Sequence, residues 1–116
     1  MNFPTAKPQT ERRAFARHIL HTQAILTLPD GRVVSARTLD IGKGGLGVVT
    51  DVNLPIGSSM QIEMRLPVHP KGNEIFRAKA QVANCVFDGK EYGFRLGLQY
   101  HELDAEAKGV LSRVPV

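Results

Sequence analysis

Apolar and polar residues alternate along much of the chain between residues 21 and 100, a pattern typical of β-strands with one buried face. The alternation is clearest from Met60 to Leu66, where every second side chain is apolar. Turns containing Gly, Pro, Asn or Asp separate the alternating runs. The pattern predicts six strands, at residues 21–28, 32–39, 46–50, 60–66, 75–87 and 92–100.

The ends of this strand series carry further signals. Residues 83–87 are apolar on both faces of the fifth strand, so we expect a bulge or a fully covered end there. Residues 103–114 place apolar side chains at helical spacing, and Asp104 is a suitable N-cap. The predicted fold class is mainly β, a six-stranded antiparallel β-barrel with a short C-terminal helix that can cover one opening.

Length and composition indicate one domain. At 116 residues the chain suits a single core, and we expect a flexible N-terminal arm at residues 1–10 and one barrel domain at residues 11–116. The 42% hydrophobic and 22% charged content is that of an ordinary soluble protein. No apolar run is long enough to span a membrane or to act as a signal peptide, so we expect a cytoplasmic location.

The positive charge is concentrated near the N-terminus. The net charge is +4, and residues 1–17 hold four basic side chains against one acidic one. Arg13 and Arg17, four residues apart, share a face in either a helix or a strand, and Arg12 precedes them. Guanidinium groups suit phosphate oxygens and the acceptor edge of guanine. The segment therefore predicts an anionic partner, although solvated arginines at a domain entrance would give the same pattern.

A glycine-rich segment, Asp40–Gly47, follows the second predicted strand. It holds four glycines and one carboxylate in eight residues. Glycine permits sharp turns and close approach of another molecule to the backbone. Taken alone, the segment fits both a tight structural turn and a surface that holds a polar ligand.

Catalytic and metal chemistry is not indicated. No Ser, Thr or Cys has an activating neighbour, and the four histidines are scattered, so we expect neither an enzyme nor a metal site. Lys43 lies in the glycine-rich segment, but the segment lacks the phosphate-binding P-loop pattern. Cys85 is the single cysteine, which excludes an intramolecular disulfide, and we expect it to be a buried, inert thiol.

Two motifs together resemble the PilZ domain family. They are Arg13-x-x-x-Arg17 before the first strand and Asp40-x-Gly42-x-x-Gly45 after the second; the family patterns are Arg-x-x-x-Arg and Asp/Asn-x-Ser-x-x-Gly. The run Tyr92–Tyr100 also resembles the last strand of the family. The resemblance covers nearly the whole chain and implies a six-stranded antiparallel barrel.

The resemblance implies a bacterial receptor for the second messenger cyclic di-GMP. Arg13 and Arg17 would grip the phosphates and the guanine acceptor edge, Asp40 would accept hydrogen bonds from a guanine, and Gly45 would keep the backbone close to the ligand. Arg12 goes with an intercalated ligand dimer in the family. Gly42 replaces the family serine, so one hydroxyl is missing and binding is expected to be weaker.

The implied receptor would be a monomeric adaptor with no cofactor. Ligand would fold the N-terminal arginines over the barrel and alter the surface offered to an effector protein, with motility or biofilm control as outputs known in the family. One alternative is a PilZ-like interaction module that does not bind the nucleotide. Another is a barrel that binds single-stranded nucleic acid. With two Tyr, five Phe and no Trp, however, the chain has few aromatic side chains on which bases could stack. We therefore expect no nucleic-acid polymer as partner.

Overall fold

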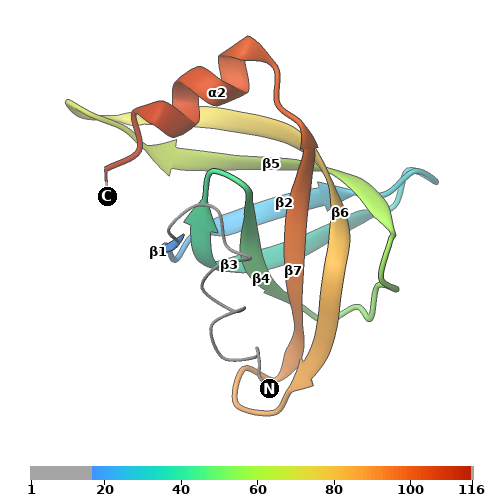
Figure 1. Ribbon diagram of the computed structural model, residues 1–116. Coiled ribbons are helices and arrows are strands. Elements are labelled where there is room, and N and C mark those ends of the chain that lie inside the picture. The colour runs from blue at the N-terminus through green and yellow to red at the C-terminus, as the bar shows by residue number, and fades with distance from the viewer. Residues whose placement is uncertain (1–16, 116) are drawn as a thin grey trace, which may run out of the picture.

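The computed structural model describes residues 17–115, which form seven strands and one helix (Figure 1). The strands are β1 Arg17–Ile19, β2 Gln23–Thr27, β3 Val33–Gly42, β4 Gly45–Thr50, β5 Ser59–Pro67, β6 Asn73–Asp88 and β7 Gly93–Glu102, and the helix is α2 Ala105–Ser112.

Six of these strands close into an antiparallel barrel. The hydrogen-bonded order is β3-β2-β5-β6-β7-β4, and β4 pairs again with β3, which closes the sheet. The predicted fold class is therefore confirmed. The short strand β1 was not predicted, and it adds to the edge of β3 outside the closed ring.

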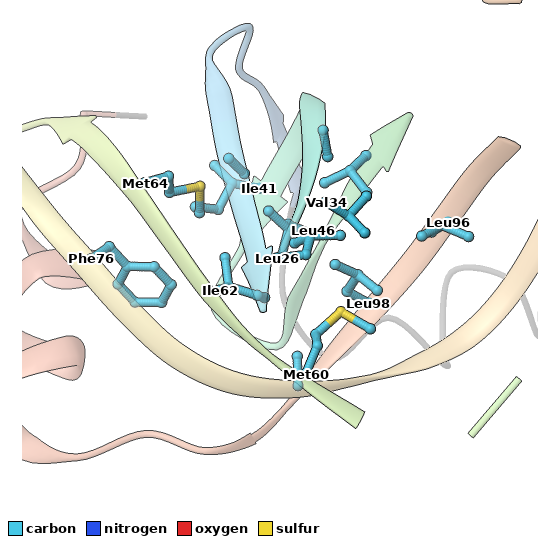
Figure 2. Close-up of a cluster of buried hydrophobic side chains, with 14 of the residues drawn as sticks. Leu26, Val34, Ile41, Leu46, Met60, Ile62, Met64, Phe76, Leu96 and Leu98 are labelled. Carbon is cyan, nitrogen blue, oxygen red and sulfur yellow. The ribbon is translucent and has the colours of Figure 1, made fainter. Parts of the chain in front are cut away.

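Alternating side chains build the core. In β5 every second residue from Met60 to Leu66 is buried, while the residues between them are exposed, as the sequence predicts. Figure 2 shows side chains from all the barrel strands, β2 to β7, pointing toward one another inside the barrel. Burial of this apolar surface, at about 25 cal/mol per Å², is the main stabilising contribution to the fold. The residues labelled there are Leu26, Val34, Ile41, Leu46, Met60, Ile62, Met64, Phe76, Leu96 and Leu98.

Helix α2 begins at the predicted cap and packs against β6. The Asp104 carboxylate accepts a hydrogen bond from the Ala107 backbone N–H at 2.8 Å. At the other end, the Arg113 guanidinium pairs with the Glu74 carboxylate on β6. The hydrogen bonds from Arg113 hold the pKa of Glu74 below its ordinary value of 4.5. In the part of the chain that the structure describes, no helix is long and apolar enough to cross a membrane.

The β6–β7 hairpin departs from the sequence prediction in two respects. A bulge lies between Val82 and Asn84, as expected, but the strand end beyond it is exposed, with Phe87 at 63%. Tyr92 was assigned to the last strand but lies in the preceding turn, with a φ of 56° and 86% of its surface exposed. The turn overrides the alternation because the chain must reverse between Asp88 and Gly93.

Cys85 was expected to be fully buried, and that expectation is wrong. The residue is half-buried, and its thiol Sγ lies 3.2 Å from Asn53 Oδ1. Beyond the bulge this part of β6 projects past its β5 neighbour, so less of the barrel remains to cover the thiol.

Candidate ligand-binding site

The strand β1 brings Arg17, the last residue of the first motif, beside the second motif. β1 pairs with β3 so that Arg17 lies opposite Gly42 and Ile19 lies opposite Asp40. The last arginine of the first motif is thus beside the middle glycine of the second motif through backbone pairing. Residues 25 positions apart in the sequence become immediate neighbours.

A bulge in β3 decides which way Asp40 faces. Val34, Ala36 and Thr38 are buried at every second position, and without interruption Asp40 would be the next buried side chain. The register with β4 shifts between Thr38 and Asp40, so one extra residue enters β3. Ile41 then takes the core position, and Asp40 is half-exposed. The bulge therefore keeps a charged carboxylate out of the barrel interior, where its desolvation would be costly.

The Asp40 carboxylate is oriented by the neighbouring strand. Its Oδ1 atom accepts a hydrogen bond from the Gly47 backbone N–H on β4 at 3.0 Å. A Cβ atom at residue 47 would lie 3.0 Å from the same oxygen and 3.4 Å from the carboxylate carbon, so glycine leaves room for this arrangement. A carboxylate has about four acceptor positions, so the oriented group can accept further donors.

Gly45 is required by packing of the barrel. A Cβ atom there would lie 2.1 Å from the Leu98 carbonyl oxygen and 3.1 Å from its carbon, far inside van der Waals contact. Any other residue would push β4 away from β7. The predicted glycine-rich loop is itself shorter than expected, because β3 continues to Gly42 and β4 begins at Gly45, leaving a tight turn at residues 43–44.

Thr38 fixes the corner from which β1 extends. Its side chain is fully buried, and its hydroxyl donates to the Leu20 carbonyl at 2.6 Å. The same oxygen accepts from the Thr22 backbone N–H at 2.8 Å. One side chain on β3 thereby holds both sides of the connection between β1 and β2, and with it the register of β1.

The structure thus brings together Asp40, Gly42, Gly45 and the backbone of Arg17. Arg12 and Arg13 lie outside the described residues. Sequence reasoning missed Thr38 and Gly47, whose roles depend on contacts between strands. The signal for the bulge was present in the sequence, since the apolar positions change phase between Ala36 and Ile41.

Elsewhere among residues 17–115 the structure has a surface hollow but no metal-binding group. A hollow of about 690 Å³ between β6 and the start of α2 is lined by both cations and carboxylates, including Arg77, Lys79, Lys108 and Glu102, and by none of the motif residues. Within the same described part of the chain, no group of three His, Cys, Asp or Glu side chains is placed to hold a metal ion.

Comparisons with known proteins agree with this geometry. Residues 11–114 match the family model of the PilZ domain. The structure of the Bacillus subtilis inhibitor of motility, MotI/DgrA, superposes with a TM-score of 0.74 at 21% identity, covering 87% of this chain and 48% of that one. The PilZ domain of Escherichia coli YcgR, solved with c-di-GMP, has a TM-score of 0.66 at 22% identity and covers 88% of this chain and 87% of that one.

A third structure, the PilZ domain of CeSA from a cellulose-synthesizing bacterium, has a TM-score of 0.59 at 14% identity, covering 84% of this chain and 91% of that one. A search of curated proteins gave no significant match. This chain spans about half the length of the MotI/DgrA structure. At these identities the structures establish a shared fold, and the family match over nearly the whole sequence goes further. With its closed barrel and a family match over residues 11–114, the chain belongs to the PilZ domain family.

Proposed function

We propose that this protein is a receptor for cyclic di-GMP that acts as an adaptor toward an effector protein. The observation that carries the proposal is the pairing of β1 with β3, which sets Arg17 opposite Gly42, two residues along β3 from Asp40. Two PilZ structures similar to this chain, both of YcgR, were solved with c-di-GMP. PilZ domains are binding or adaptor modules rather than enzymes.

The chemistry of the paired motifs suits a cyclic dinucleotide. Arg13 and Arg17 supply guanidinium groups for the phosphates and for the guanine acceptor edge. Asp40 supplies a carboxylate that accepts from guanine N–H donors, and the bond from Gly47 fixes its direction before ligand arrives. Such pre-orientation lowers the entropy lost on binding.

Gly42 sets the expected strength of the interaction. A serine at this position would offer a hydroxyl to the ligand, and loss of one hydrogen bond costs about 0.5 to 1.5 kcal/mol. Gly42→Ser should therefore tighten binding by up to about tenfold. If the affinity is unchanged, the second motif does not contact the ligand in the way proposed.

Titration calorimetry with cyclic di-GMP tests the receptor directly. Arg13→Ala, Arg17→Ala and Asp40→Ala should each weaken binding by about tenfold or more, since each removes a charge-assisted hydrogen bond. Arg65→Ala, which removes an exposed arginine from β5, is the matched control and should bind like the wild type. No heat from the wild type at high micromolar ligand would favour an interaction module that does not bind the nucleotide. Binding of an oligonucleotide without response to cyclic di-GMP would favour the nucleic-acid barrel.

The ligand would act by closing the N-terminal arginine segment over the barrel. Binding should then slow tryptic cleavage after Arg12 and Arg13, and the Asp40→Ala variant should show no such protection at the same ligand concentration. Unchanged cleavage of the wild type at saturating ligand would refute the closure.

Arg12 supports a ligand dimer by family resemblance, so Arg12→Ala should lower the measured stoichiometry from two ligands toward one. The receptor would work in the bacterial cytoplasm, and control of motility is the proposed output because the similar protein MotI is an inhibitor of motility.

A further inference from the structure

The outer half of β6 has an open hydrogen-bonding edge. β5 pairs with β6 only as far as Gln81, and two further backbone bonds join Val82 to Gly57 and Ser58. From Ala83 to Asp88, β6 pairs with β7 on one side, and no other strand among residues 17–115 pairs with its second side. Figure 1 shows this part of the hairpin reaching beyond the other strands. Unpaired strand edges are templates for another strand.

Little charge protects this edge. Natural edge strands carry lysine, proline, inward charges or bulges that discourage pairing with a second chain. The half of β6 covered by β5 contains Glu74, Arg77 and Lys79, whereas residues 81–87 contain no charged residue and no proline; the open part has only the bulge at its start and Asp88 at its end. Val86 and Phe87 between them are 59% and 63% exposed. Three of the four charged residues of β6 thus lie where the edge is already paired, and exposed apolar side chains lie where it is open.

The hairpin is also held rigidly in its projecting position. Asp88 accepts hydrogen bonds from the backbone N–H groups of Lys90 and Glu91 at 3.0 and 3.3 Å, and its carboxylate pairs with Arg95 at 3.0 Å. The Arg37 guanidinium on β3 pairs with the Glu91 carboxylate at 3.0 Å. An edge that is ordered in advance loses little conformational entropy when it binds.

We propose that a second copy of this chain occupies the edge, with the two β6 strands pairing antiparallel about a two-fold axis at Val86. This register places Val86 opposite Val86 of the second copy, an apolar cross-strand pair of the kind that stabilises sheets. Asp88 then lies opposite Asn84 of the second copy, so no charge faces a like charge. Each edge satisfies the unpaired backbone groups of the other, and the contact is isologous.

The association is weak and independent of the proposed ligand. A contact of about six residues from each chain buries less than the roughly 1,200 Å² typical of stable complexes. We therefore expect a dissociation constant on the order of 100 µM. At such an affinity dilute protein is monomeric, and dimers form where the local concentration is high.

Sedimentation equilibrium of the whole chain without ligand, from about 10 µM to about 1 mM, tests the proposal. The wild type should show a monomer–dimer equilibrium, and Val86→Lys should raise its dissociation constant at least tenfold, because two lysines would face each other at the axis. Ile25→Lys is the matched control, since Ile25 is 38% exposed but lies on β2, where it is paired with Ser35 of β3 on one side and with Glu63 of β5 on the other. It should leave the equilibrium unchanged. A monomer at 1 mM, or a dimer that Val86→Lys does not weaken, would overturn the proposal.

Oxidative cross-linking locates the axis. In a Cys85→Ser background, Val86→Cys places two thiols opposite each other, at a Cβ separation of about 4.5 to 5.5 Å that approaches disulfide geometry. Mild oxidation should give a covalent dimer for this variant and not for Ile25→Cys in the same background, because β2 is paired on both sides of Ile25. Equal cross-linking of the two variants would mean random collision and would refute the assigned register.

Discussion

Gly47→Ala should uncouple the Asp40 carboxylate from the site while leaving the barrel folded. The added Cβ would lie 3.0 Å from Asp40 Oδ1 and 3.4 Å from its carbon, tighter than nine in ten real Cβ contacts, so the carboxylate must shift by a few tenths of an ångström. The shift weakens the 3.0 Å hydrogen bond from the residue 47 N–H. Hydrogen bonds to charged groups contribute about 1.5 to 3 kcal/mol, and the half-exposed position favours the lower end.

Two quantities should therefore change in Gly47→Ala. The free energy of unfolding should fall by about 1 to 1.5 kcal/mol, which lowers the thermal midpoint by roughly 4 to 6 °C for a domain of this size. The affinity for cyclic di-GMP should fall by about tenfold, because the misdirected carboxylate no longer meets the guanine donors. Urea unfolding and titration calorimetry measure the two quantities separately.

A double-mutant cycle isolates the cause. With Asp40→Ala as the second change, the effect of Gly47→Ala on affinity should disappear, since the group it displaces is already absent. The coupling between the two positions should be about 1 kcal/mol or more. Additive losses in the double variant would refute the reasoning, because Gly47 would then act on binding by a route that does not involve the carboxylate.

Three other predictions follow from the packing. Gly45→Ala should destabilise the barrel by about 1 to 3 kcal/mol because β4 must move away from β7, whereas Gly109→Ala, with nothing within 4 Å of the new Cβ, should be neutral or stabilising. Equal changes in stability for the two variants in urea unfolding would contradict this. Thr38→Val should lower the free energy of unfolding by about 1 to 3 kcal/mol, because the Thr22 N–H and the Leu20 carbonyl lose their partner, and it should weaken ligand binding as β1 loses its register. A drop in stability without a change in affinity would show that Thr38 does not support the site. Glu74→Gln should be slightly less stable than the wild type at neutral pH, because pairing with Arg113 lowers the folded pKa of Glu74 below 4.5. This difference in stability should vanish as pH falls through the folded pKa, and a difference that persists at pH 2 would exclude the ion pair as its cause.

Local patterns in the sequence predicted the barrel strands well, because side-chain alternation and turn composition act within a few residues. The run from Met60 to Leu66 and the cap at Asp104 are examples, and both are confirmed. The short strand β1 could not be predicted in this way. Its three residues form a strand because Thr38 holds the corner and β3 offers an edge, and both conditions depend on contacts between distant segments.

The sequence predicted the motif residues of the candidate site, but not the residues that orient them. Asp40, Gly42 and Gly45 were identified through the family resemblance, and the structure adds a packing reason for Gly45. Gly47 could not be distinguished from the glycines around it, since only the fold places the Asp40 carboxylate above it. Tyr92 and Cys85 show the opposite error, where alternation was extended into a turn and into an open strand end.

The bulge in β3 ties the orientation of Asp40 to the folding of the barrel. A β3 strand that kept Leu39 but lost the bulge would place Leu39 opposite Gly47, and because side chains alternate between faces, Ile41 would turn outward and Asp40 inward. The shift of register that removed the carboxylate from the proposed binding surface would therefore also place a charge in the barrel interior. A barrel that folds stably must keep this carboxylate outward, so folding enforces the same orientation that the proposed ligand would require.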